Sequence, residues 1–263
     1  NEGRSEDFKK NFAITHFFNP PRYLNLFEVI PGPDCEKNVL DFLMDYGEKF
    51  LGKTSVLAKD TPAFIGNRIG TFGIQSLFHQ VKNGEYTVEE VDKLTGMAIG
   101  RPKSATFRTA DVVGLDTLCH VANGIYENCP DDESRNVFKL PDFLKKMLDE
   151  KMLGSKTKKG FYKKVVGKDG KSKILSLNLK TLEYNEQKKV NFETLNAARK
   201  VKSRAEKFKV LVSGDDKASH FYREVFAKMF AYVQHRVPEI SDDLHSIDSC
   251  LLYTSPSPRD SDT

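Results

Sequence analysis

Two short apolar runs near the start of the chain, each interrupted by one titratable residue, restrict how these residues can fold. The first run, residues 12–18, contains His16, and the second, residues 25–30, contains Glu28; Pro20-Pro21 separates them. Both runs have the length of β-strands, in which side chains alternate between two faces. His16 and Glu28 therefore each share a face with the apolar side chains two residues before and after them.

A carboxylate among apolar side chains needs a partner, because an unpaired buried charge costs several kcal/mol. His16 is the obvious partner for Glu28, so we expect the two side chains to lie within hydrogen-bond reach of each other. A histidine paired with a glutamate can act as a general base, since imidazole exchanges protons near neutral pH. A structural ion pair at a strand edge explains the spacing equally well.

Four motifs follow one another between residues 15 and 162. They are His16-Phe17-Phe18-Asn19-Pro20 with Glu28, Asp60-Thr61-Pro62-Ala63-Phe64-Ile65-Gly66-Asn67-Arg68, Asp111-Val112-Val113-Gly114-Leu115-Asp116-Thr117, and Gly160-Phe161-Tyr162. In this order they resemble the L-3-hydroxyacyl-CoA dehydrogenases of fatty-acid β-oxidation. The resemblance implies an α/β remnant of a Rossmann-type domain followed by a mainly α-helical C-terminal domain.

The resemblance also implies a role for five residues, with NAD as the cofactor and an acyl-CoA as the substrate. His16 would take the proton from the 3-hydroxyl group, and Glu28 would orient His16 and stabilise its protonated form. Asn67 would hydrogen-bond the reacting oxygen, Asn19 would contact the nicotinamide side of the cofactor, and Lys156 would reach NAD. These residue types suit the reaction, because oxidation by hydride transfer needs one group to accept the proton and another to hold the oxygen.

Two departures from the family pattern concern the cofactor. No Gly-x-Gly-x-x-Gly turn occurs in the 263 residues, although a dinucleotide site needs such a turn for the pyrophosphate. We interpret the chain as a fragment that begins near the end of the cofactor domain. Lys158 also stands where the family usually has a glycine, and because a long cation would crowd a tight turn, the assignment of Lys156 is weaker than that of His16.

The apolar periodicity and the Gly, Pro and capping residues predict the remaining elements. A further strand is expected over 54–59, a hairpin over 160–165 and 172–177, and helices over 35–50, 61–82, 87–97, 104–127, 142–151, 192–212, 216–235 and 241–249. We divide the chain accordingly into the end of an NAD-binding domain (1–60), a helical substrate and dimerisation domain (61–165), a hairpin and linker (166–190), and the start of a second helical domain (191–249).

The last fourteen residues, 250–263, differ in composition from the rest of the chain. The Ser/Pro-rich sequence from Thr254 onward cannot continue a helix. It resembles translated sequencing-adapter read-through, so we interpret residues 250–263 as a non-native tail. A genuine flexible tail is the alternative.

Charge and cysteine content exclude several classes of protein. The net charge is +4, and no interleaving of basic and aromatic residues indicates binding of nucleic acid. The four cysteines have no Cys-x-x-Cys spacing and the six histidines form no ligand pattern, so we expect a reducing compartment and no metal. No apolar run is long enough to span a bilayer. We therefore expect a cytoplasmic protein, and the resemblance implies a homodimer through the helical domain.

Two other functions remain open at this stage. The chain could be a non-catalytic helical association module, or it could belong to another two-domain NAD(P)-dependent dehydrogenase that acts on hydroxy acids. The His16–Glu28 pair and Asn67 favour a 3-hydroxyacyl-CoA dehydrogenase over both.

Overall fold

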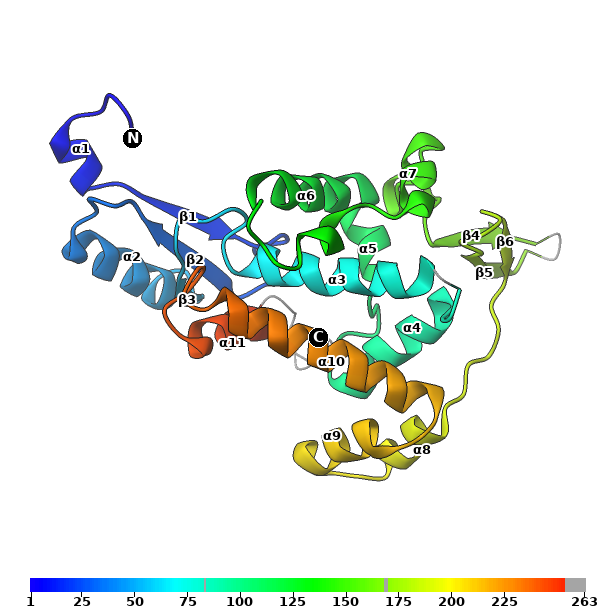
Figure 1. Ribbon diagram of the computed structural model, residues 1–263. Coiled ribbons are helices and arrows are strands. Elements are labelled where there is room, and N and C mark those ends of the chain that lie inside the picture. The colour runs from blue at the N-terminus through cyan, green and yellow to red at the C-terminus, as the bar shows by residue number, and fades with distance from the viewer. Residues whose placement is uncertain (83, 168–169, 254–263) are drawn as a thin grey trace. The chain divides into compact units, whose positions relative to one another are not determined.

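Two compact units make up the part of the chain that the computed structural model describes, namely residues 1–82, 84–167 and 170–253 (Figure 1). The first unit contains residues 1–70 and 231–253, and the second contains residues 71–230. The first unit holds both members of the expected His–Glu pair.

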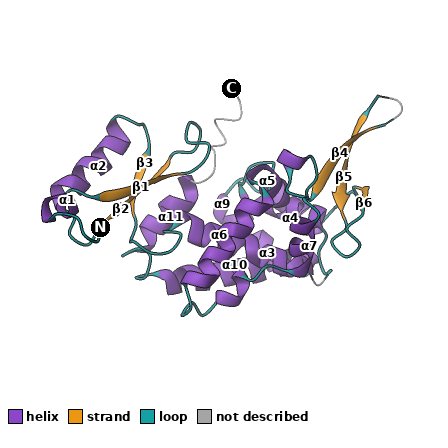
Figure 2. Cartoon of the chain, turned by 90° about the horizontal axis from the view of Figure 1, so that it is seen from above, coloured by secondary structure: helices purple, strands orange, loops and turns teal. Residues whose placement is uncertain are grey.

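A three-stranded sheet with the order β1-β2-β3 is the centre of the first unit (Figure 2). β1 (Ala13–Phe17) is antiparallel to β2 (Leu26–Pro31), and β2 is parallel to β3 (Thr54–Leu57). The central strand β2 is buried, whereas the edge strand β1 is partly exposed. All three expected strands are confirmed to within two residues. The helices that lie wholly in this unit are α1 (Glu6–Lys10), α2 (Lys37–Lys49) and α11 (Leu244–Tyr253).

Helices α2 and α11 cover opposite faces of this sheet. In α2, Gly47 touches the side of the sheet that bears Phe27; a Cβ added at Gly47 would lie 2.5 Å from the Phe27 ring. In α11, the Sγ atom of Cys250 lies 3.5 Å from Glu28 Oε1. Phe27 and Glu28 are neighbours in one strand, so their side chains point to opposite faces.

The helical spacing of the apolar residues Val39, Leu43, Tyr46 and Phe50 predicts that they form the buried side of α2. The structure differs, because Tyr46 and Phe50 are 40% and 76% exposed. The Tyr46 ring stacks on Phe42 and on Phe50, with centroid distances of 5.9 and 5.5 Å. The close approach of Gly47 to the sheet sets the rotation of the helix, because a small residue lets the two backbones come together. This leaves the three aromatic rings on the outside.

Helix α11, expected to end at Ser249, continues to Tyr253. Ile247 and Cys250, three residues apart on one face of the helix, are 1% and 0% exposed. Burial of these two side chains against the sheet extends the helix into the segment that we interpret as a tail. Residues 254–263 lie outside the described part of the chain.

Helix α3 (Gly66–Lys82) begins five residues later than the Thr61-Pro62 pattern indicates. Ala63 and Phe64 have φ angles of 67° and 50°, and residues with positive φ cannot continue a right-handed helix. A contact from a distant strand explains the later start: Glu28 accepts hydrogen bonds from the backbone N–H groups at the beginning of the helix.

The second unit is mainly helical and carries a small antiparallel sheet with the order β4-β5-β6. Besides most of α3, its elements are α4 (Val88–Thr95), η1 (Met97–Ile99), α5 (Phe107–Val113), α6 (Leu115–Asn128), η2 (Arg135–Phe138), α7 (Asp142–Asp149), η3 (Ser155–Thr157), β4 (Tyr162–Val166), β5 (Ser172–Leu177), β6 (Tyr184–Glu186), α8 (Glu193–Arg199), α9 (Arg204–Ser213) and most of α10 (Lys217–Arg236). The η elements are short 3-10 helices.

Several expected elements of this unit are confirmed and two are divided. The Thr87-Val88-Glu89-Glu90 sequence predicts a capping box at the start of α4, which Thr87 and Glu90 form, and the expected hairpin of β4 and β5 is present. The expected helix over 104–127 is two helices, because Gly114 between them has a φ of 99°. The expected helix over 192–212 is likewise divided into α8 and α9, and the short strand β6 was not expected. The Lys168-Asp169 part of the hairpin turn lies outside the described residues.

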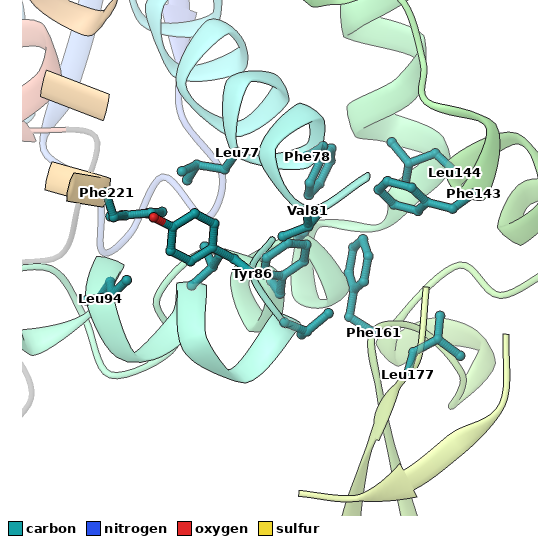
Figure 3. Close-up of a cluster of buried hydrophobic side chains, with 14 of the residues drawn as sticks. Leu77, Phe78, Val81, Tyr86, Leu94, Phe143, Leu144, Phe161, Leu177 and Phe221 are labelled. Carbon is teal, nitrogen blue, oxygen red and sulfur yellow. The ribbon is translucent and has the colours of Figure 1, made fainter. Parts of the chain in front are cut away.

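Aromatic rings from helices and strand ends form the core of the second unit (Figure 3). The ring of Phe161 contacts those of Phe78, Phe107 and Phe143, with centroid distances of 5.5, 4.5 and 6.3 Å. The first of these rings comes from α3, the second from α5 and the third from α7. The Gly-Phe-Tyr motif therefore supplies the side chain that joins three helices.

A buried carboxylate joins two of the family motifs. Asp111, which is 5% exposed, accepts hydrogen bonds from the backbone N–H groups of Phe161 and Tyr162 at 2.8 and 2.9 Å. Gly160 packs directly on this carboxylate, since a Cβ there would lie 2.0 Å from Asp111 Oδ1. Burial raises the pKa of Asp111 to about 6, although both hydrogen bonds oppose the shift.

Candidate active site

The antiparallel pairing of β1 with β2 places His16 directly opposite Glu28. His16 Nδ1 lies 2.6 Å from Glu28 Oε2, so the expected hydrogen-bonded pair is confirmed. The Glu28 side chain is fully buried, and the His16 side chain is 28% exposed. The pair thus has a buried acidic end and a basic end that solvent or a ligand can reach.

The two oxygen atoms of Glu28 have different partners. Oε2 faces the imidazole, whereas Oε1 accepts the backbone N–H groups of Ile65 and Gly66 at 3.0 and 2.9 Å. Gly66 is the first residue of α3, where backbone N–H groups have no partner within the helix and a negative charge is stabilised. These hydrogen bonds replace those with water that the Glu28 carboxylate loses when it is buried.

The hydrogen bond to Glu28 fixes which ring nitrogen of His16 can accept a proton. An ionised carboxylate only accepts hydrogen bonds, so Nδ1 of His16 carries the proton and Nε2 of the neutral ring has the free lone pair. The rings of Phe18 and Phe64 lie 5.0 and 5.7 Å from the imidazole, measured between centroids. These aromatic side chains restrict the orientation of the imidazole. The arrangement can therefore take a proton at Nε2.

Asn67 and Asn19 lie in the same unit as the His16–Glu28 pair. Asn67 is the second residue of α3 and is half-buried; it follows Gly66, whose N–H group is bound by Glu28. Asn19 is exposed and lies in the loop after β1, three residues beyond His16. The roles of the two amides in holding a reacting oxygen or a cofactor stay predictions.

Lys156 belongs to the second unit, in the short helix η3. Its ammonium group makes a salt bridge with Asp116, and the hydrogen bond from Lys156 lowers the pKa of the Asp116 carboxyl. Both side chains are about half exposed. The expected contact of Lys156 with NAD stays a prediction, and Asp116 is the partner that the sequence did not indicate.

Arg68 is a second residue of this region whose partners the sequence pattern does not indicate. Its side chain is fully buried, beside Asn67 in the sequence. Tyr232 and Glu239 bind the guanidinium group. One feature of the sequence points to a need for such partners: Arg68 lies among apolar positions at the start of an expected helix. An arginine buried there requires an acidic or polar partner elsewhere in the chain.

The described residues contain no cluster of metal ligands and no disulfide. Within residues 1–82, 84–167 and 170–253, no three His, Cys, Asp or Glu side chains lie close enough together to hold a metal ion. Cys119, Cys129 and Cys250 are buried, and none of the four cysteines forms a disulfide. Nor is any helix of this part of the chain long and apolar enough to cross a membrane.

Two family models match adjacent parts of the chain. The NAD binding domain of 3-hydroxyacyl-CoA dehydrogenase matches residues 4–61, and the C-terminal domain of 3-hydroxyacyl-CoA dehydrogenase matches residues 64–164. The first match contains the His16–Glu28 pair, and the second begins just before Asn67. The boundary between them falls in the segment with positive φ angles that precedes α3.

Individual proteins show the same similarity. A probable 3-hydroxyacyl-CoA dehydrogenase of Bacillus subtilis is 46% identical over 96% of this chain and 31% of its own length. A probable 3-hydroxyacyl-CoA dehydrogenase of Deinococcus radiodurans is 48% identical over 65% of this chain and 48% of its own length. The crystal structure of (S)-3-hydroxybutyryl-CoA dehydrogenase from Ralstonia eutropha matches 57% of this chain and 50% of its own, with 28% identity and a TM-score of 0.52. The chain thus spans about a third to a half of the curated relatives' length.

Proposed function

Because this chain belongs to the 3-hydroxyacyl-CoA dehydrogenase family, we propose that it carries the proton-transfer site of an NAD-dependent enzyme that oxidises L-3-hydroxyacyl-CoA to 3-oxoacyl-CoA. The reaction belongs to fatty-acid β-oxidation. One observation supports this proposal above the others: the partly exposed His16 imidazole is hydrogen-bonded through Nδ1 to the fully buried carboxylate of Glu28.

In this proposal His16 Nε2 accepts the proton of the 3-hydroxyl group. Glu28 keeps the proton of the neutral ring on Nδ1 and interacts favourably with the imidazolium that forms. Asn67 donates a hydrogen bond to the oxygen that becomes the ketone. Bound NAD would supply the hydride acceptor. Reversal of these steps returns the proton from His16 to the oxygen during reduction.

The residues present fit only one end of the cofactor. Asn19, exposed and close to His16 in the sequence, can hydrogen-bond the nicotinamide amide, and Lys156 can contribute a positive charge. Neither replaces the row of backbone N–H groups that a glycine turn offers to a pyrophosphate, and these 263 residues contain no such turn. We therefore assign the reacting end of the site to this chain and leave the pyrophosphate unassigned.

The domain division and the assembly are parts of the same proposal. Residues 1–60 would end the NAD-binding domain and residues 61–165 would form the substrate and dimerisation domain, a division supported by the two family matches. We propose a homodimer through the helical domain. The four cysteines, none of which forms a disulfide, support a location in the cytoplasm.

Oxidation of a 3-hydroxyacyl-CoA tests the proposal. The protein to assay is the longest natural protein that contains this sequence, with NADH formation followed by absorbance. His16→Gln should lower kcat by about two to four orders of magnitude and leave KM little changed, because a general base acts mainly in the transition state.

The control is His120→Gln, since His120 is an exposed histidine on α6. It should keep the activity of the parent protein. Full activity of His16→Gln would contradict the assignment of the base. An inactive parent would favour a helical association module, and activity only with short hydroxy acids that lack CoA would favour another class of hydroxy-acid dehydrogenase.

A further inference from the structure

A fully buried arginine lies directly after Asn67 at the start of α3. The Nε–H group of Arg68 donates to the Tyr232 hydroxyl at 2.8 Å, and its Nη2 lies 3.2 Å from Glu239 Oε1. The Arg68 side chain is 0% exposed, whereas that of Glu239 is 38% exposed. A guanidinium group without solvent depends on such partners, because a buried charge without a counter-charge is strongly unfavourable.

Both partners come from a part of the chain that is distant in sequence. Tyr232 lies near the end of α10, and Glu239 lies in the segment that follows this helix. Arg236 donates to the other oxygen of Glu239, and its guanidinium carbon lies 5.0 Å from the centre of the Tyr232 ring. Glu239 therefore binds two arginines, one through each oxygen, and Tyr232 contacts both.

These contacts complete a set of restraints on the first turn of α3. Glu28 binds the backbone N–H group of Gly66, and Tyr232 and Glu239 bind the side chain of Arg68. Asn67 lies between the two anchored residues. The backbone of Asn67 is thus held on one side by Glu28 of strand β2 and on the other by the partners of Arg68 in residues 232–239.

We propose that Tyr232 and Glu239 are positioning residues that act through Arg68 to hold the Asn67 amide in place for the reaction. The inference rests on the proposed function and adds two residues that lie outside both family matches, which end at residue 164. Small displacements of an orienting group can lower a rate on the order of a hundredfold, so anchoring of this kind affects kcat.

A neighbouring ion pair provides a matched control. Lys59 Nζ lies 2.6 Å from Asp242 Oδ1 and donates to the carbonyl oxygen of Pro238 at 2.6 Å. This pair attaches the same segment to the end of β3 and has no contact with Arg68 among those described. Asp242→Asn thus weakens attachment of the segment without removing the counter-charge of Arg68.

The variants Glu239→Gln and Tyr232→Phe test the inference in the longest natural protein that contains this sequence. Glu239→Gln keeps the shape and removes the counter-charge, and should lower kcat about 10- to 100-fold with less than about a threefold change in KM. Tyr232→Phe should lower kcat by a smaller factor. Asp242→Asn should keep kcat within about twofold of the parent.

A double-mutant cycle with Asn67→Ala separates positioning from general destabilisation. If Glu239 acts through Asn67, Glu239→Gln should have little further effect on kcat once the Asn67 amide is absent. An equal loss of kcat in both backgrounds would overturn the inference. So would a loss of kcat in Asp242→Asn as large as that in Glu239→Gln.

Hydrogen exchange on the 263-residue chain provides a readout that needs neither substrate nor cofactor. The backbone N–H groups of Gly66 and Arg68 should exchange faster in Glu239→Gln and Tyr232→Phe than in Asp242→Asn. Unchanged exchange in both variants would overturn the inference, whether or not the parent is active. An inactive parent would instead overturn the proposed function, so the two failures are distinguishable.

Discussion

The carboxylate of Glu28 accepts a hydrogen bond from the backbone N–H group of Gly66 at 2.9 Å, across 38 positions of sequence. The same carboxylate holds His16 Nδ1 at 2.6 Å through its other oxygen. One side chain thus connects the edge strand of the sheet to the first residue of α3. Substitution of Glu28 should therefore affect both the tautomer of His16 and the beginning of the helix.

The first prediction concerns the tautomer. In Glu28→Gln, the amide oxygen can still accept the N–H groups of Ile65 and Gly66, which places the amide NH2 group toward His16 Nδ1. A donor at this position favours the proton on Nε2, so the lone pair needed for the reaction is lost. We expect kcat to fall by about two to four orders of magnitude, which is the usual effect of losing a general base.

The nitrogen chemical shifts of His16 at high pH check this prediction. They should report a proton on Nδ1 in the parent chain and on Nε2 in Glu28→Gln. Identical shifts in the two proteins would show that Glu28 does not select the tautomer. Glu48→Gln, on the exposed side of α2, is the control and should change neither the shifts nor kcat.

The second prediction concerns cofactor affinity. The 263-residue chain should show no measurable affinity for NADH, because Asn19 and Lys156 cannot replace several backbone donors and a helix dipole. Titration calorimetry measures this directly. Micromolar binding would contradict the prediction and would mean that other residues of this chain form a pyrophosphate site.

The His–Glu pair could be predicted from the sequence because both residues lie in strands, where a period of two fixes which side chains share a face. The capping box of Thr87 and Glu90 could be predicted because the two residues are close in sequence. In both cases a local sequence pattern is sufficient for the prediction. For His16 and Glu28, the antiparallel pairing of β1 with β2 then places the two side chains opposite each other.

The start of α3 and the anchoring of Arg68 could not be predicted in this way. Local pattern favours a helix from Pro62, but Glu28 fixes the start at Gly66 from a distant strand. Tyr232 and Glu239 lie more than 160 positions from Arg68, and no periodicity connects them. Tertiary contacts of this range override local propensity, as the exposed aromatic side chains of α2 also show.

The third prediction concerns stability against pH in the second unit. Burial raises the pKa of Asp111 from its ordinary value of 3.8 to about 6 in the folded chain. The folded state therefore binds more protons than the unfolded state between these values, and stability falls as pH rises. The contribution is fully present below about pH 4, is lost by about pH 6, and amounts to a few kcal/mol at most.

Urea unfolding between pH 4 and 7 measures this effect. Asp111→Asn should remove most of the decline in unfolding free energy over that interval, because the amide does not titrate. Asp149→Asn, an exposed carboxylate in α7, should leave the decline intact. Asp92, whose pKa burial also raises, should contribute a further decline of the same sign. A decline in Asp111→Asn as steep as that in the parent chain would contradict the raised pKa of Asp111.

The last prediction compares two glycines of the second unit that differ in the space around them. A Cβ at Gly160 would lie 2.0 Å from Asp111 Oδ1 and 2.7 Å from Gly154 Cα, so the backbone that holds Phe161 would have to move. Gly160→Ala should lower the free energy of unfolding by about 1–3 kcal/mol, the usual cost of overpacking.

Gly124 is the matched control, because it lies within α6 with no atom within 4 Å of a new Cβ. Gly124→Ala should raise stability by about 0.5–1 kcal/mol, because alanine favours the helix. Denaturant unfolding of both variants checks the contrast, and equal effects would mean that the contact between Gly160 and Asp111 does not determine the packing of the two motifs.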